Sequence, residues 1–130
     1  MTADLVVLDA SALLALLFNE PGADIIAARL ATSVISAVNL PEAAAKLADR
    51  GMPAAAIALT FSEFDLDVRA FDLDQARIAG ALRGPTPAFG MSLDDRACLA
   101  SAQALQTVAF TADRAWADLG LDSVRVKVIR

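Results

Sequence analysis

The stretch Leu5–Leu17, LVVLDASALLALL, constrains the fold of this chain more than any other part of it. Four apolar residues, including two valines, run directly into Asp9, and a short continuous apolar run of this kind is typical of a strand buried on both faces. The leucine-rich residues that follow predict a helix, with Asp9 and Ser11 near its start. The stretch therefore places the carboxylate of Asp9 at the carboxyl end of a central strand, the edge at which open α/β sheets bind ligands.

The rest of the sequence alternates between strand and helix patterns. Runs rich in β-branched residues predict strands, and apolar residues at helical spacing, bounded by proline or glycine, predict helices. The predicted strands cover residues 33–36, 66–71, 107–111 and 124–129, and the predicted helices cover residues 23–31, 37–51, 53–64, 72–84, 94–105 and 112–120. A proline-containing loop is expected at 85–92. We therefore expect a single domain over residues 1–130, with an α/β fold and a mostly parallel sheet.

Composition excludes several kinds of site. The chain has no histidine and a single cysteine, Cys98, so histidine triads, zinc sites built on histidine and internal disulfides are all excluded. The net charge of −5 argues against a basic nucleic-acid-binding domain. No apolar run reaches the roughly 18 residues that a membrane span needs, and the start of the chain does not resemble a signal peptide. We therefore expect a cytoplasmic protein without a membrane segment.

Four of the sixteen acidic residues occupy unusual positions. Asp9 and Asp113 each follow a predicted strand, so both are expected at the same edge of a parallel sheet. Asp95 lies in the first turn of a predicted helix with an apolar stripe, and Glu42 lies among small apolar residues in the first turns of another. Each acid also has a simpler interpretation, because a carboxylate near a helix N-terminus stabilises the helix by about 0.3–1 kcal/mol.

Carboxylates gathered at one edge would repel one another, and this repulsion would raise their pKa values. A divalent cation relieves the repulsion, and hard oxygen ligands suit Mg²⁺ or Mn²⁺. Such an ion lowers the pKa of a bound water and neutralises charge on a phosphoryl oxygen. The acids therefore favour metal-dependent hydrolysis of a phosphate ester.

Four segments together resemble a known family. They are VVLDASALLALLFNEPGA, SAVNLPEAAAKL, SLDDRACLASA and TADRAW, and in this order they resemble the PIN-domain ribonucleases, most closely the VapC-type toxins of bacterial toxin–antitoxin pairs. The resemblance covers nearly the whole chain and is least distinctive over residues 52–71. It implies a three-layer α/β/α PIN-like fold with a mostly parallel central sheet.

The resemblance also implies a set of site residues. The acids that hold Mg²⁺ or Mn²⁺ in that family fall on Asp9, Glu42, Asp95 and Asp113. The hydroxyl groups of Ser11 and Thr111 match supporting positions. Asn39 either orients ligands or waters, or caps its helix. The chain departs from the family at Asp94, where a small residue is usual; helical spacing favours Asp95 as the inward acid, with Asp94 as an N-cap or a supporting acid.

The implied activity is hydrolysis of single-stranded RNA by a homodimeric toxin that a cognate antitoxin silences. Arg96 and Arg114 each follow a site acid and either contact RNA phosphate or form surface ion pairs. The apolar helix at residues 53–64 either forms one wall of an antitoxin groove or serves as core or dimer contact.

Three other functions remain open at this stage. A phosphatase with an aspartyl nucleophile at Asp9 would need a second acid two residues later, where this chain has Ser11. A receiver-like signalling domain would need a lysine at a late strand end, whereas Lys127 lies within the last predicted strand. A PIN-like metal-binding scaffold that acts only through protein binding is the third.

Overall fold

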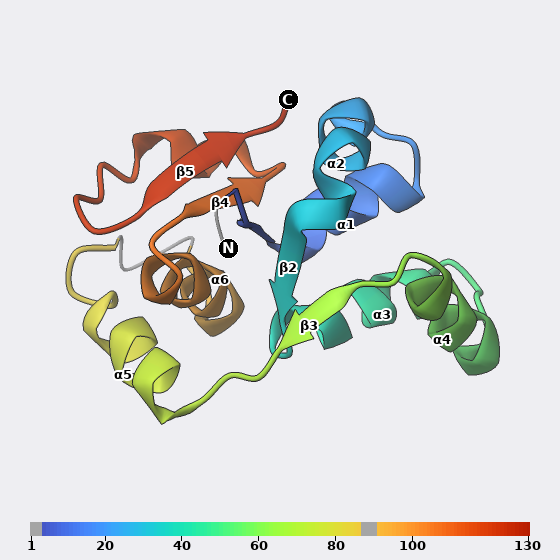
Figure 1. The fold of residues 1–130 in the computed structure, drawn as a ribbon, viewed down its shortest axis with the longest axis horizontal. Helices are drawn as coiled ribbons and strands as arrows, with labels where there is room; N and C mark the ends of the chain where they lie inside the picture. Colours follow the sequence, from blue (N-terminus) through green and yellow to red (C-terminus); the bar gives the residue numbers. More distant parts are fainter. Residues whose placement is uncertain (1–3, 87–90) are drawn as a thin grey trace.

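The computed structural model describes residues 4–86 and 91–130 and contains one five-stranded sheet. The strands are β1 (Val6–Leu8), β2 (Ser33–Ser36), β3 (Asp67–Arg69), β4 (Val108–Thr111) and β5 (Arg125–Val128). Their order across the sheet is β3-β2-β1-β4-β5, and each neighbouring pair runs parallel (Figure 1). The predicted α/β fold is confirmed, and β5 lies at a sheet edge as its two basic residues indicated.

Every predicted helix is present with slightly different ends. The helices are α1 (Ala10–Leu17), α2 (Ala23–Arg29), α3 (Asn39–Asp49), α4 (Ala54–Glu63), α5 (Leu73–Ala81) and α6 (Leu93–Ala104), with 3₁₀ helices η1 (Leu30–Thr32) and η2 (Arg114–Asp118). The short helix predicted over 112–120 is present as η2, a 3₁₀ helix, the form that short helical segments often take. Of the predicted loop at 85–92, residues 87–90 lie outside the described part of the chain.

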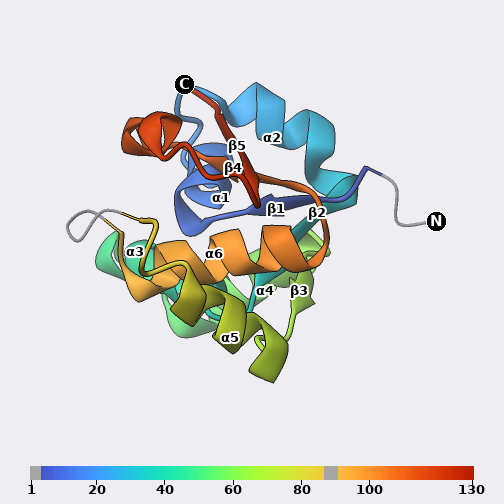
Figure 2. The same cartoon turned by 90° about the vertical axis from the view of Figure 1, so that its left-hand side faces the viewer.

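The sheet lies between two helical layers (Figure 2). Val6 and Leu8 pack with α1 and α2, whereas Val7, between them, packs with α6. This alternation follows from the two-residue period of a strand, and it explains why all of β1 is apolar. A third cluster joins α1 to α3 and α4 through Leu13, Leu47 and other buried residues. Within the described ranges, no helix is long and apolar enough to cross a membrane.

The topology determines where the candidate site residues lie. β1 and β4 are neighbours, with Leu8 opposite Phe110, and the backbone N–H of Asp9 donates to the carbonyl of Phe110 at 3.1 Å. Because the strands are parallel, the residues after β1 and after β4 emerge at the same edge of the sheet. Asp9 and Asp113 are therefore neighbours in space although about a hundred residues separate them in sequence.

The fold predicts an unequal response at two glycines. Gly22 has φ +97°, and a Cβ added there would lie 2.8 Å from the carbonyl oxygen of Ile129; Gly51 has φ +91° with nothing within 4 Å. Gly51→Ala should cost about 1 kcal/mol through backbone strain, and Gly22→Ala about 2 kcal/mol or more because Ile129, directly after β5, must also move. Urea denaturation of both variants measures the difference in unfolding free energy. Equal decreases in the two variants would show that Ile129 can move away from the added methyl group at no cost in free energy.

Candidate active site

A pocket of about 190 Å³ lies at the carboxyl edge of the sheet. Its lining includes all four acids singled out by the sequence, from segments far apart in the chain: Asp9, Glu42, Asp95 and Asp113. Ser11 and Leu14 of α1 and Lys46 of α3 complete most of the wall. Sequence reasoning did not select Lys46, although its position one helical turn after Glu42 would place both side chains on one face of α3.

Asp9 is the most tightly held of these acids and is only 5% exposed. Its Oδ1 accepts hydrogen bonds from the Ser11 hydroxyl at 2.7 Å and from the Ala12 N–H at 2.8 Å, and its Oδ2 accepts from the Thr111 hydroxyl at 2.5 Å. Burial raises the pKa of Asp9, although these hydrogen bonds lower it. Asp9 therefore caps α1 and lines the pocket at the same time.

The two hydroxyl groups link the ends of β1 and β4. Ser11 Oγ lies 3.3 Å from Thr111 Oγ1 and accepts from the Ala112 N–H at 2.9 Å. Thr111 Oγ1 accepts from the Asp113 N–H at 3.1 Å. Each hydroxyl thus contacts Asp9 and the chain that leads to Asp113. The positions of Ser11 and Thr111 suit the supporting role expected of them.

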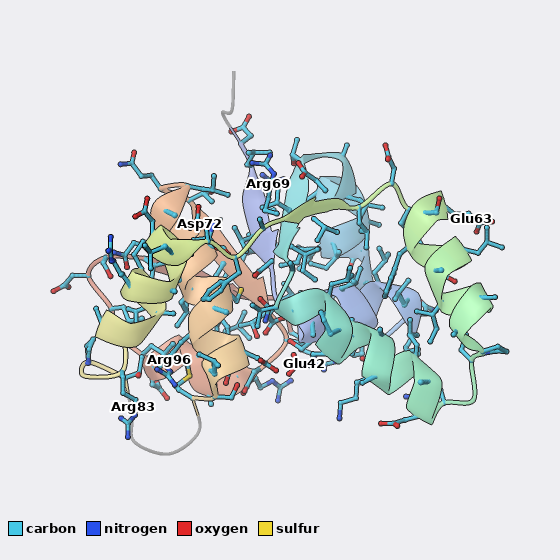
Figure 3. The ribbon with its side chains drawn as sticks, turned by 90° about the horizontal axis from the view of Figure 1, so that it is seen from below. Glu42, Glu63, Arg69, Asp72, Arg83 and Arg96 are labelled. Atoms are coloured by element: carbon cyan, nitrogen blue, oxygen red, sulfur yellow. The ribbon has the colours of Figure 1, made fainter. Side chains whose placement is uncertain are left out.

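The pKa of Glu42 depends on its burial and on the neighbouring acids. Burial, followed by the charge of the Asp94 carboxylate and a hydrogen bond shared with it, raises the pKa of Glu42 from 4.5 to about 7. The charges of Asp95 and Asp9 raise it further. Figure 3 shows Glu42 where α3 meets α6. These carboxylates are therefore close enough to interact, and Asp94 takes part through Glu42.

The start of α6 settles which residue caps it. Ser92 is the N-cap: its Oγ accepts from the Asp95 N–H at 3.1 Å, and Asp95 Oδ2 accepts from the Ser92 N–H at 3.0 Å. The alternative that Asp94 caps the helix is therefore wrong. The sequence carries a signal for this reciprocal capping, because Ser92 is followed three residues later by the acid Asp95, just before an apolar stripe. Burial raises the pKa of Asp95, and the charges of Asp113 and Asp94 add to the effect.

Asn39 joins α3 to α6. Its side chain is 1% exposed, and its Nδ2 donates to the backbone carbonyl of Asp94 at 2.9 Å. Within the described residues, its Oδ1 has no hydrogen-bond partner. Asn39 does not cap α3, since Val38 holds the N-cap position and no side-chain bond caps that end. Its contact instead holds the first turn of α3, which carries Glu42, against the first turn of α6.

The two arginines expected near RNA phosphate do not line the acid pocket. Arg96 is half-buried, and its Nη1 donates to the Ala79 carbonyl of α5 at 3.4 Å, on the side of α6 away from Glu42 (Figure 3). Arg114 is exposed and donates to the backbone carbonyl of Arg130 at 3.4 Å. The basic side chain that does line this pocket is Lys46.

The donor set fits a hydrated Mg²⁺ or Mn²⁺ by its chemistry. Four carboxylates with hard oxygen donors face one small space, and Mg²⁺ takes only one or two of them while it keeps several waters. Across residues 4–86 and 91–130, however, no three acids are arranged closely enough to hold an ion directly. Asp9, Asp95 and Asp113 each use oxygens as hydrogen-bond acceptors in helix caps. The set therefore suits a cation that retains water rather than a closed cage.

Comparisons with known proteins agree with the fold described above. The PIN domain family matches residues 6–121. A chain of a toxin–antitoxin complex from Klebsiella pneumoniae superposes with a TM-score of 0.72 at 19% identity, over 96% of this chain and 98% of that one. A chain of DNA-bound VapBC from Salmonella typhimurium superposes with a TM-score of 0.75 at 15% identity, over 97% and 98%. At these identities the likeness shows a shared fold. No curated protein matches the sequence.

The raised pKa of Glu42 predicts how the metal-free protein responds to pH. The folded chain binds more protons than the unfolded chain between pH 4.5 and about 7, so the unfolding free energy should fall as pH rises through this window. Glu42→Gln should remove the part of that fall that Glu42 contributes, so its melting temperature relative to the unchanged protein should be higher at pH 8 than at pH 4.

Melting curves in excess chelator at several pH values test this expectation. Glu63→Gln is the matched control, because Glu63 is exposed on α4, far from Glu42 in Figure 3. This control should leave the pH dependence unchanged. Parallel pH profiles for Glu42→Gln and the unchanged protein would show that Glu42 titrates normally.

Proposed function

Because the chain belongs to the PIN domain family, we propose that it is a Mg²⁺- or Mn²⁺-dependent endoribonuclease that hydrolyses phosphodiester bonds of single-stranded RNA. The observation that carries the proposal is the convergence of four acids on one 190 Å³ pocket at the carboxyl edge of the sheet. Those acids come from the ends of two strands and the first turns of two helices, and each matches a family motif in the sequence.

The proposal gives the four acids one shared role and assigns supporting roles to three polar residues around them. Asp9, Glu42, Asp95 and Asp113 would hold the ion, which supplies a water of lowered pKa and neutralises charge on the phosphoryl oxygen when bound. Ser11 and Thr111 fix the orientation of the Asp9 carboxylate through their hydroxyl protons. Asn39 keeps the carboxyl of Glu42 near α6. Asp113 is exposed at the rim, so an RNA strand can reach the acids from solvent.

The proposed biological role is that of a VapC-type toxin that a cognate antitoxin restrains. The structurally similar chains come from VapBC and other toxin–antitoxin complexes. Four large apolar side chains of the described structure are 40–64% exposed: Leu59 of α4, Val68 of β3, Leu73 of α5 and Leu93 of α6. Leu59 lies on the apolar helix that the sequence assigned to an antitoxin groove or to core or dimer contact, and its exposure leaves it free to contact the antitoxin or a second copy in a homodimer. A cytoplasmic location fits this role.

The other enzymatic and signalling functions fit the site less well. Ser11 stands where an aspartyl phosphatase would need a second acid, and its hydroxyl donates a hydrogen bond to Asp9. Lys127, the lysine considered for a receiver-like domain, is exposed on β5 and does not line the acid pocket. A third alternative, a scaffold that binds proteins without cleaving RNA, predicts no cleavage with either metal ion, and the cleavage assay distinguishes it from a ribonuclease.

We expect Asp9→Asn to lower metal-dependent cleavage of a labelled single-stranded RNA by about 100-fold or more, because it removes a charge at the centre of the acid pocket. The variant should fold, since an amide oxygen can still accept from the Ala12 N–H while the amide nitrogen donates to Thr111 Oγ1. Asp118→Asn, a neutralised acid exposed on η2, is the control and should cleave normally. Circular dichroism confirms that both variants fold.

Excess chelator should abolish cleavage by the unchanged protein, and added Mg²⁺ or Mn²⁺ should restore it. Cleavage that persists in chelator would contradict the metal mechanism. A folded protein that cleaves no RNA with either ion would favour the scaffold instead.

A further inference from the structure

A second pocket, of about 350 Å³, opens beside the acid pocket. Ser11, Leu14 and Lys46 line both, so the two form one continuous depression in the surface. We propose that the second pocket is a binding site for the RNA nucleotide adjacent to the cleaved phosphodiester. This inference rests on the proposed ribonuclease function and adds to it a place for the substrate strand.

The walls of the second pocket combine an apolar floor with basic side chains. Leu14 and Phe18 of α1 supply apolar surface. Lys46 of α3, Arg50 just after α3, and Arg130 at the end of the sequence supply positive charge. A nucleotide presents the matching groups, because its base has apolar faces and its phosphate is an anion. Grooves that bind single-stranded nucleic acid use this combination of stacking surface and basic side chains.

Arg50 and Phe18 form a stacked pair. The guanidinium carbon of Arg50 lies 4.0 Å from the centroid of the Phe18 ring, at a distance typical of a cation–π contact. Arg50 is exposed, so a ligand can approach this residue from solvent. Bases stack on arginine planes as well as on aromatic rings. The pair is therefore a preformed platform for one base.

Lys46 and Arg130 are placed to meet phosphate. Within the described residues, no ion pair joins Lys46 to an acid, so its charge is available. Arg130 is held in position: its Nε donates to the Ala112 carbonyl at 3.4 Å, and its Nη1 lies 3.6 Å from Glu20 Oε1. Lys46 stands where the two pockets join, which is where the backbone of a strand would pass from one to the other.

The charge balance separates the roles of the two pockets. The second pocket has three basic residues against two acids; Arg130 and Glu20 pair with each other, which leaves Lys46 and Arg50 against Asp49. The acid pocket has four carboxylates and only Lys46. A cation is favoured in the acid pocket and a phosphate in its neighbour. A strand that lies across both therefore places one phosphodiester at the acids and the next nucleotide on the platform.

The test compares two substrates. One is a labelled single-stranded RNA, and the other is methyl p-nitrophenyl phosphate, a phosphodiester without a neighbouring nucleotide. Arg50→Gln and Arg130→Gln should each raise KM for RNA about tenfold, since each removes a contact to a charged or stacked group, and should leave hydrolysis of the small diester unchanged. Arg77→Gln, a neutralised arginine exposed on α5, is the matched control and should change neither.

Binding measured in chelator, where no cleavage is expected, gives a second readout. In a plot of the logarithm of RNA affinity against the logarithm of salt concentration, the slope of Arg130→Gln should be smaller in magnitude by about 0.7, because one phosphate contact is lost. Arg50→Lys keeps the charge but not the planar group, so it should retain the salt dependence and still bind RNA more weakly.

The outcomes distinguish this inference from the proposed function. If the unchanged protein hydrolyses neither substrate, the ribonuclease proposal fails. If it cleaves RNA with metal but both arginine variants bind and cleave as Arg77→Gln does, the second pocket does not bind a nucleotide. The remaining candidate for its occupant is then a segment of a partner protein. Equal losses on the small diester would also overturn it, because the arginines would then act on the acid pocket itself.

Discussion

The parallel pairing of β1 with β4 is the contact on which the rest of the site depends. It brings the end of β1 beside the end of β4, so that Thr111 can donate a hydrogen bond to the Asp9 carboxylate. A carboxylate that is only 5% exposed is costly to bury unless its oxygens are satisfied. Three donors offset that cost for Asp9, and two of them, Ser11 and Ala12, come from the first turn of α1. One acid thus joins a strand, a helix and a neighbouring strand.

The clustering of acids around Asp9 opposes the stability of the folded protein. Burial, together with the negative charges of the neighbouring acids, raises the pKa of Glu42 to about 7, which means that placing Glu42 in this pocket opposes folding at neutral pH. Clusters of like charge with shifted pKa values are typical of functional sites. The neighbouring basic residue Arg50 does not neutralise these acids by forming an ion pair with one of them, since its guanidinium lies over the Phe18 ring. The surface therefore keeps an acidic and a basic pocket side by side.

The predictions that came from local pattern agree with the structure, and those that depended on side-chain direction agree less well. The strand at Val6–Leu8 and the helix after it were predictable because an apolar run and a helical period are local signals. The direction of Arg96 was not, because it depends on α5 packing beside α6 and offering the Ala79 carbonyl. Helical spacing relates Lys46 to Glu42, but only the packing of α3 beside α1 shows that Lys46 lines two pockets.

The sequence by itself determined the order of strands and helices, the buried character of β1, and the positions of four acids at the ends of these elements, since burial and helix capping act over a few neighbouring residues. Only the tertiary structure decided that these acids share one pocket, that Ser92 rather than Asp94 begins α6, and that Asn39 bonds to α6. Those outcomes require the sheet order β3-β2-β1-β4-β5, which brings together residues that local pattern cannot relate. The basic pocket beside the acids has the same origin, because α1, α3 and the last residue of the chain meet only in the folded protein.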